Sequence, residues 1–141
     1  MGSKPFGPTA HGAIDYAFVV SLLLAPTLLD LKGPARTLCY AFGASAGTLN
    51  ALTDHPLGLR RVIPLRVHGQ VDTPFVPILL LLPWATGALR QPGARRFFTS
   101  FFLAALTNYL LTDDRADDAA EAPHAREAAP PGGRQARPER P

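Results

Sequence analysis

The sequence predicts an all-α protein with four transmembrane helices, arranged as two tandem helical hairpins and followed by a disordered C-terminal tail. Three observations support this prediction. Four apolar segments each approach the ~20 residues that cross a bilayer as a helix. These segments form two similar pairs, and the apolar pattern stops after residue 113.

The four apolar segments cover residues 12–31, 35–53, 69–89 and 96–112. Polar residues are not confined to one side of them, whereas a surface helix of a soluble protein has one polar face. A helix also satisfies its backbone hydrogen bonds internally, as a bilayer requires. We therefore favour membrane helices over a soluble four-helix bundle. The repeat described next also argues against a cleaved signal peptide at residues 12–31, because a similar segment lies in the middle of the chain.

An internal repeat relates the two halves. The stretch "HGAIDYAFVVSLLLAP" from His11 resembles "HGQVDTPFVPILLLLP" from His68, and "ARTLCYAFGASAGTLNALTD" resembles "ARRFFTSFFLAALTNYLLTD". Each unit contains two helices, so both units enter the membrane from the same side. This predicts a parallel duplication, unlike the inverted repeats of many transporters.

The repeat sets the expected organisation of the chain. Residues 1–10 form an N-terminal segment, residues 11–54 the first two-helix repeat, and residues 55–67 a basic interfacial connection. Residues 68–113 form the second repeat. Residues 114–141 are rich in Pro, Ala, Gly and charge, and we predict that they are disordered because they cannot bury enough apolar surface.

Charge and cysteine content exclude several classes of protein. Up to residue 112 there are nine Lys or Arg and four acidic residues, and from residue 113 onward five Arg and seven acidic residues. The basic residues lie in short loops and not in a stripe with aromatics, which argues against nucleic-acid binding. One cysteine, Cys39, allows neither an intramolecular disulfide nor a Cys-based metal site.

The loops suggest a membrane partner and leave the orientation almost open. Arg60, Arg61 and Arg66 of the connection are placed to reach lipid phosphates. Both termini should lie on the same side of a membrane, which we expect to be the bacterial cytoplasmic membrane. Lys and Arg are equally numerous on the two sides, so the positive-inside rule does not decide. We favour cytoplasmic termini because the charged tail then need not be translocated across the membrane.

Polar residues gather where the helices should meet at one end of the bundle. His11 and Asp15 are four positions apart, as are His68 and Asp72, so each pair shares a helix face. The second helix of each unit ends at the same side. The candidate polar cluster therefore contains His11, Asp15, His68, Asp72, Asp54, Asp113, Asn50 and Asn108.

Two interpretations of this cluster remain open. In the first, the polar groups are architectural: they cap helices or join them by hydrogen bonds. In the second, they form a site, since ionisable groups at membrane depth mark pathways, and His with Asp can bind a divalent metal or relay protons. The pattern includes no Ser-His-Asp order, phosphate loop or HExxH motif, so we assign no catalytic residue and no cofactor.

Glycine and proline predict details of helix packing. Gly43 and Gly47 form a G-x-x-x-G pattern, a close-approach surface for a second helix that would join either the two hairpins or two protomers. Pro26 and Pro83 lie inside the first and third helices, where each removes a backbone hydrogen bond and should kink the helix.

The repeated H-G-x-x-D opening, "LPW" at residues 82–84, and "TDHPLG" followed by "RRVIPLRVHGQVD" resemble the SPW repeat family of small bacterial membrane proteins. The first unit has "APT" where the second has "LPW". The resemblance covers residues 10–113 and implies two tandem units of two membrane helices, without an established activity.

These observations predict a small, non-enzymatic integral membrane protein with a structural or accessory role. Its expected partners are the lipid bilayer and a second copy or another membrane protein. The alternative is a small transporter, channel, or metal- or proton-handling protein that uses the His/Asp cluster.

Overall fold

The computed structural model describes residues 5–112, which form four α-helices and one short 3-10 helix. The helices are α1 (Pro8–Leu28), α2 (Gly33–Leu52), α3 (Leu65–Ala85) and α4 (Pro92–Leu111), with η1 (Ala88–Arg90) between the last two. No strand occurs within these residues. The predicted all-α fold with four helices is therefore confirmed for this part of the chain. The predicted tail lies outside the described residues.

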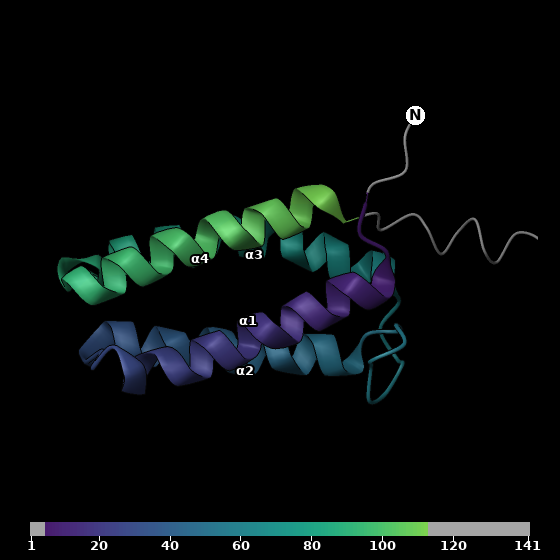
Figure 1. Cartoon of the computed structure of the whole chain (residues 1–141), viewed down its shortest axis with the longest axis horizontal. Coiled ribbons are helices and arrows are strands. Elements are labelled where there is room, and N and C mark those ends of the chain that lie inside the picture. The colour runs from purple at the N-terminus through teal and green to yellow at the C-terminus, as the bar shows by residue number, and fades with distance from the viewer. Residues whose placement is uncertain (1–4, 113–141) are drawn as a thin grey trace, which may run out of the picture.

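The helices form two antiparallel pairs, α1 with α2 and α3 with α4 (Figure 1). The start of α1 and the end of α4 lie at the same end of the bundle (Figure 1). Phe6 confirms this placement, because its backbone nitrogen donates a hydrogen bond to the carbonyl of Leu111. We call this the terminal end, and the end that carries the two hairpin turns the turn end.

All four helices start earlier than their apolar segments predict, and in three of them proline occupies the first turn. Pro8, Pro34 and Pro92 lie at the first or second helical position. Proline suits this place, since its fixed φ is already helical and the missing N–H has no partner there anyway. Hydropathy alone could not locate these starts, because the first turns also carry polar residues.

The two hairpin turns contact each other at the turn end. The backbone nitrogen of Lys32 donates to Oε1 of Gln91 at 3.1 Å, and Nε2 of Gln91 donates to the carbonyl of Lys32 at 2.8 Å. These two residues occupy equivalent positions of the two units, 59 residues apart. The reciprocal bonds link the hairpins at one end of the bundle.

The connection between the hairpins folds back on the end of α2. Asp54 donates its backbone N–H to the carbonyl of Ile63 at 2.7 Å, and the backbone nitrogens of Val62 and Ile63 donate to Leu52. Helix α3 starts at Leu65, before the predicted end of the connection. Because its own backbone groups are paired, the connection is an ordered loop at the terminal end.

The core between the four helices contains equivalent residues of the two units. Leu22 and Leu79, which are 57 positions apart, are 1% and 2% exposed. Phe42 and Phe101 are both buried, and Phe42 packs edge-on against Phe98. Burying a side chain of this size contributes about 1.5–3 kcal/mol, so these residues hold the hairpins together through apolar contact.

The glycine pattern of α2 packs against α1. A Cβ atom on Gly43 would lie 2.9 Å from Leu23 Cδ2, and one on Gly47 would lie 3.2 Å from Val19 Cγ1. The two glycines therefore admit α1 of the same hairpin, and not the other hairpin as one of the two interpretations predicted, because they lie on the face of α2 that packs against α1.

The helical hydrogen bonding continues past both prolines that should kink the helices. Pro26 and Pro83 are buried, and each lies two residues before the end of its helix. The lost hydrogen bonds thus fall near the helix ends. The kinks themselves stay a prediction.

Candidate functional site

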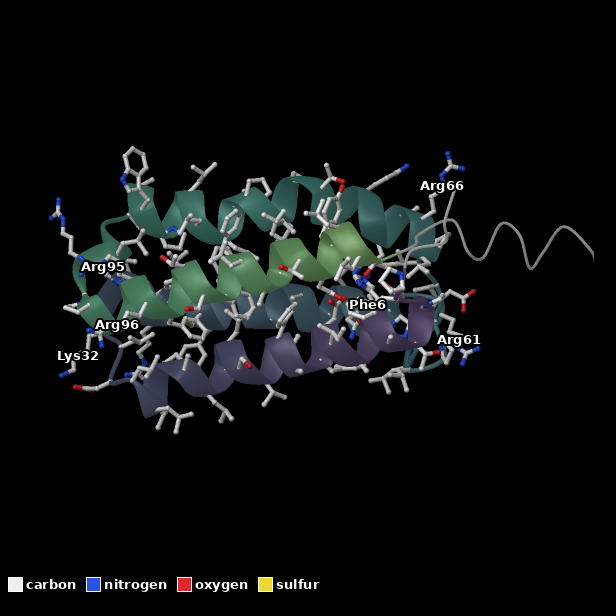
Figure 2. All side chains as sticks on the ribbon, turned by 45° about the horizontal axis from the view of Figure 1, so that its top comes forward. Phe6, Lys32, Arg61, Arg66, Arg95 and Arg96 are labelled. Atoms are coloured by element: carbon white, nitrogen blue, oxygen red, sulfur yellow. The ribbon has the colours of Figure 1, made fainter. Side chains whose placement is uncertain are left out.

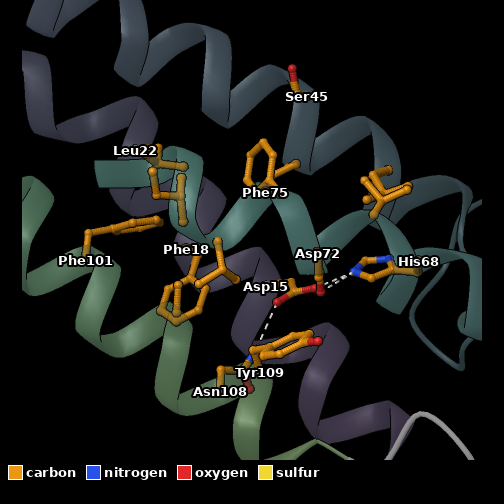
Figure 3. Close-up of a pocket in the computed structure, with 16 residues that line it drawn as sticks. Asp15, Phe18, Leu22, Ser45, His68, Asp72, Phe75, Phe101, Asn108 and Tyr109 are labelled. Atoms are coloured by element: carbon orange, nitrogen blue, oxygen red, sulfur yellow. Dashed lines mark hydrogen bonds and ion pairs between the residues drawn. The ribbon is translucent and has the colours of Figure 1, made fainter. Parts of the chain in front are cut away.

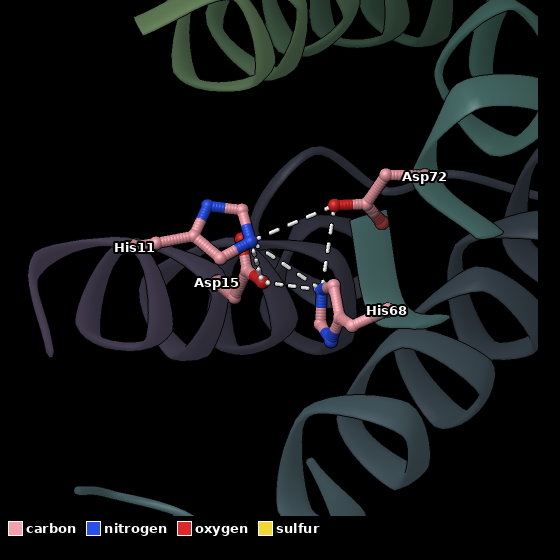
Figure 4. A group of neighbouring side chains, drawn as sticks. All are labelled: His11, Asp15, His68 and Asp72. Atoms are coloured by element: carbon pink, nitrogen blue, oxygen red, sulfur yellow. Dashed lines mark hydrogen bonds and ion pairs between the residues drawn. The ribbon is translucent and has the colours of Figure 1, made fainter. Parts of the chain in front are cut away.

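Two histidines and two aspartates converge at the terminal end, between α1 and α3 (Figure 4). Nε2 of His11 lies 3.3 Å from Oδ2 of Asp15, and Nε2 of His68 lies 3.3 Å from Oδ2 of Asp72. These are the two i,i+4 pairs that helical periodicity predicts. We call these four residues the His/Asp cluster.

The two pairs also contact each other, which sequence spacing alone could not predict. His68 Nε2 lies 3.2 Å from Asp15 Oδ2, and His11 Nε2 lies 3.6 Å from Asp72 Oδ2. The two Nε2 atoms are 3.4 Å apart. All four atoms lie within 4.8 Å of one another. One small volume therefore receives a nitrogen and an oxygen from each of the two helices.

The cluster is shielded from solvent, but unevenly. The side chains of His11 and His68 are 4% and 3% exposed, whereas those of Asp15 and Asp72 are 15% and 18% exposed. Buried charges need a compensating partner because desolvation is costly. Two carboxylates this close to each other require a positive charge between or beside them.

Two threonines bind the other nitrogen of each imidazole. Thr112 Oγ1 lies 2.9 Å from His11 Nδ1, and Thr53 Oγ1 lies 2.8 Å from His68 Nδ1. Each hydroxyl also lies 2.7–2.8 Å from the carbonyl four residues before it, Leu49 for Thr53 and Asn108 for Thr112. A hydroxyl has one proton to donate. Because that proton goes to the backbone carbonyl, the oxygen accepts a hydrogen bond from Nδ1–H.

The threonine contacts favour the Nδ1–H tautomer for both histidines, and at His11 the Asn108 amide nitrogen competes for the same Nδ1 atom at 3.2 Å. With the proton on Nδ1, the lone pair of each neutral ring is on Nε2, the atom that faces the two carboxylates. Four electron-pair donors then point at one another with no donated proton between them. Such a set is stable when a cation, either a metal ion or a proton, lies among the four atoms.

Five of the six distances among these atoms match a tetrahedron around a small metal ion, and the sixth, between the two carboxylate groups, lies within 4.8 Å. Zinc bonds of about 2.0–2.1 Å in tetrahedral geometry require ligand atoms about 3.3–3.4 Å apart. The five distances given above, which join nitrogen to nitrogen and nitrogen to oxygen, range from 3.2 to 3.6 Å. Neutral imidazole and carboxylate are both common zinc ligands.

The two predicted asparagines play different roles. Asn108 joins the cluster: its Nδ2 donates to Asp15 Oδ1 at 3.2 Å and lies 3.2 Å from His11 Nδ1. Its Oδ1 is buried and has no hydrogen-bond partner within residues 5–112. Asn50 instead donates a hydrogen bond to the carbonyl of Gly12. Its Oδ1 accepts a hydrogen bond from His55 Nε2 at 2.9 Å.

Asp54, one of the two predicted aspartates that follow a threonine, does not belong to the cluster. Asp54 is exposed, and its Oδ1 lies 3.9 Å from Arg61 Nε. The peptide turns outward after Thr53, so the threonine points into the bundle and the aspartate away from it. Asp113 lies outside the described residues.

Sequence reasoning missed His55 as part of this end of the bundle. Its ring is buried and fills the space above Gly12, where a Cβ atom would lie 2.5 Å from His55 Cε1. Burial lowers the pKa of His55 below its ordinary value, because the charged ring is disfavoured there. No spacing rule connects His55 with Gly12. Thr53 and Thr112 did carry a signal, since both units end in "TD".

Comparison of the chain with family models, with curated proteins and with solved structures finds no match. The resemblance to the SPW repeat family stays a prediction that rests on the residues quoted for it.

Proposed function

We propose that this chain is a small integral membrane protein of four spans that binds one divalent transition-metal ion at its His/Asp cluster. Zn²⁺ fits the geometry best. The observation that carries the proposal is the set of five near-tetrahedral distances of 3.2–3.6 Å, combined with a hydrogen bond at each Nδ1. The two units contribute equally, so the ion joins the hairpins.

The supporting residues have the roles that surround metal ligands in proteins. A ligand histidine usually donates its second N–H to an oxygen, which fixes the ring and its tautomer. Thr53 and Thr112 supply that oxygen here. Asn108 donates a hydrogen bond to the carboxylate of Asp15. Each of the two hairpins thus supplies a His, an Asp and the threonine that orients the other hairpin's His.

Helix α1 supports the membrane part of the proposal. It is the one helix within residues 5–112 whose length and mean hydropathy (1.4 over 18 residues) suit a membrane crossing. A signal sequence or the core helix of a soluble protein shares these properties. Only 28% of that apolar stretch is buried, however, and a core helix of a soluble protein would be mostly covered.

The other helices support spanning by length and surface rather than by mean hydropathy. Each contains 20 or 21 residues, which is about 30 Å of helix and matches a hydrocarbon core. Large apolar side chains such as Leu81, Trp84 and Leu103 are more than half exposed. Basic side chains gather at both ends instead (Figure 2). A bilayer would solvate this distribution, with lipid phosphates near the basic residues.

Four protein ligands are typical of structural zinc sites, whereas catalytic sites keep an open position. The metal centre therefore fits the structural or accessory role predicted above. A proton shared within the cluster is the competing explanation. The two Nε2 atoms are 3.4 Å apart, so such a proton would lie between an imidazole and a carboxylate, where His68 Nε2 and Asp15 Oδ2 are 3.2 Å apart.

Metal content of the purified full-length protein tests the proposal. In detergent with added Zn²⁺ and after removal of free ion, we expect about one zinc per chain by elemental analysis. The double variant His11→Asn/His68→Asn should lose it. Asparagine keeps an N–H donor near the position of Nδ1 while removing Nε2, so the threonine contacts can persist.

The matched control is His55→Gln, which changes a buried histidine at the same end that is not a ligand. It should bind zinc as the wild type does. A wild-type protein that retains less than about one tenth of an equivalent of zinc, cobalt or manganese would show that the cluster holds protons and not metal. Equal loss in the double variant and the control would indicate general unfolding.

A further inference from the structure

A cavity of about 150 Å³ lies beside the His/Asp cluster, in the middle of the bundle (Figure 3). All four helices contribute to its wall. Most of the wall is apolar, with Phe18, Phe75 and Phe101 among the residues that line it. An apolar cavity of this size in another protein binds benzene. The cavity thus has room for one six-membered ring.

One end of the cavity is polar and meets the cluster. Among the described residues, Asp15, His68 and Asp72 line the cavity but His11 does not. The cavity therefore faces one side of the ligand tetrahedron, the side where the carboxylates are partly exposed. An added ligand atom can approach a bound ion from this side, and zinc accepts a fifth ligand in some sites.

Asn108 lies at the same end of the cavity, next to Asp15 and Tyr109 (Figure 3). The residue is 5% exposed, and its Oδ1 has no partner within residues 5–112. Buried polar atoms are nearly always hydrogen-bonded. Because Oδ1 is closed off even to a water-sized molecule, the acceptor for a ligand O–H group at this end is a carboxylate oxygen of Asp15 or Asp72, which both line the cavity and are partly exposed.

The cavity reaches the surface between α2 and α3. Ser45 and Val71, one from each helix, both line it and are exposed. Small residues of α2 line this side, because Ala46 follows Ser45 and also lines the cavity. If the helices span a bilayer as proposed, this opening faces lipid. The entering molecule must then be soluble in the membrane.

We propose that the cavity binds a small membrane-soluble molecule with a hydroxylated ring, a phenol, whose oxygen contacts the metal and whose ring lies among the phenylalanines. This inference rests on the proposed metal centre. Three independent features agree with it: the volume fits one ring, the aromatic wall suits the ring, and the polar end combines an open side of the metal with an acceptor for the hydroxyl proton.

The test uses full-length protein in detergent with Co²⁺ in place of zinc. Cobalt has visible absorption bands that change when a fifth ligand joins a four-coordinate site. We expect phenol to change the spectrum in a saturable way. Toluene lacks the oxygen and anisole lacks the hydroxyl proton. Both should bind at least about tenfold more weakly, because neither can donate a hydroxyl proton to the carboxylates at the polar end of the cavity.

A pair of variants locates the binding site. Ala46→Leu fills the cavity without changing a metal ligand and should weaken the phenol response about tenfold or more. Ala44→Leu, on the same helix but exposed and outside the cavity, should leave it unchanged. Cobalt binding should be normal in both.

The outcomes separate this inference from the proposed function. Absence of cobalt binding overturns the metal centre itself. Normal cobalt binding with no spectral response to phenol, or with an equal response to toluene, overturns the ligand while the metal centre stands. A phenol response that Ala46→Leu does not weaken shows that phenol reaches the metal by another route, and this also overturns the cavity assignment.

Discussion

Two threonines decide which nitrogen of each cluster histidine is available to a cation. Thr53 and Thr112 are buried, and both hold an imidazole that belongs to the other hairpin. Removing the hydroxyl leaves Nδ1–H without an acceptor and frees the ring to rotate. The resulting change in metal affinity is the most direct measure of the role of these two threonines.

We expect Thr112→Val to weaken zinc binding by about 10–100-fold, the usual effect of losing a hydrogen bond to a ligand histidine. Valine keeps the shape and the four ligands. Competition with a chromophoric chelator measures the affinity. Thr107→Val is the control, because Thr107 makes the same bond to the carbonyl four residues before it but is exposed. Equal effects of the two variants would contradict a specific role for Thr112.

His55 gives this end of the molecule a dependence on pH. Burial lowers its pKa in the folded protein, while the unfolded residue titrates near 6.5. Between these two values the unfolded chain binds a proton that the folded chain does not. The stability that neutral His55 contributes is thus complete above about pH 6.5 and is lost as the pH falls toward the lowered pKa.

We therefore expect the thermal unfolding midpoint of the metal-free protein in detergent to fall between about pH 7 and pH 5. The decrease should be smaller in His55→Gln, which keeps a donor toward Asn50. His11, His68 and Asp15 also act on His55 electrostatically, so only the difference between wild type and variant is interpreted. Parallel pH curves would show that His55 does not contribute.

At the scale of the helices, α2 is the element that makes the two hairpins differ. It carries Gly43 and Gly47 where α4 has Phe102 and Leu106 at the equivalent positions. The glycines admit α1 closely, and the neighbouring small residues leave room for the cavity. The asymmetry of the sequence thus lies at the contact with α1, since α4 has the small residues Ala104 and Ala105 at the positions equivalent to Ser45 and Ala46.

We expect Gly43→Leu to lower the free energy of unfolding by about 1–3 kcal/mol, the usual cost of overpacking. A Cβ atom at this position already lies 2.9 Å from Leu23 Cδ2 and 3.3 Å from Leu22 Cβ, so a longer side chain must push α1 away. Thermal or denaturant unfolding in detergent measures the change. Ala44→Leu, one residue later and exposed, should have little effect, and a similar loss in both would point to helix propensity instead.

At the scale of the whole molecule, the arrangement of the ends makes the membrane proposal testable. Thr9 and Arg60 lie at the terminal end, whereas Lys32 and Arg95 lie at the turn end. All four are exposed. If the helices span a bilayer, the two ends face different compartments.

We expect the full-length chain to remain with membranes after a carbonate wash. Single cysteines introduced at these four positions, with the buried Cys39 replaced by alanine, should react with an impermeant maleimide as two pairs from opposite sides. Recovery of the chain in the soluble fraction without detergent would contradict the proposal. Labelling of all four positions from one side would contradict spanning.

The apolar segments and the helical period determined much of this protein in advance. They predicted four helices, their pairing into hairpins and the meeting of each His with the Asp four residues later. These features follow from local chain geometry, because residues four apart share a helix face whatever the tertiary fold. Proline at the first turns moved the helix starts, since it sets φ independently of hydropathy.

Only the tertiary structure decided how the hairpins combine. His11 contacts Thr112 across 101 positions, and His68 contacts Thr53 across 15. Asp54 turned outward although it follows a buried threonine. Such contacts depend on how the helices pack and on where a loop leaves its helix, and neither is encoded in the local periodicity. The sequence therefore determined which chemical groups each helix presents, and packing between helices determined which of them meet.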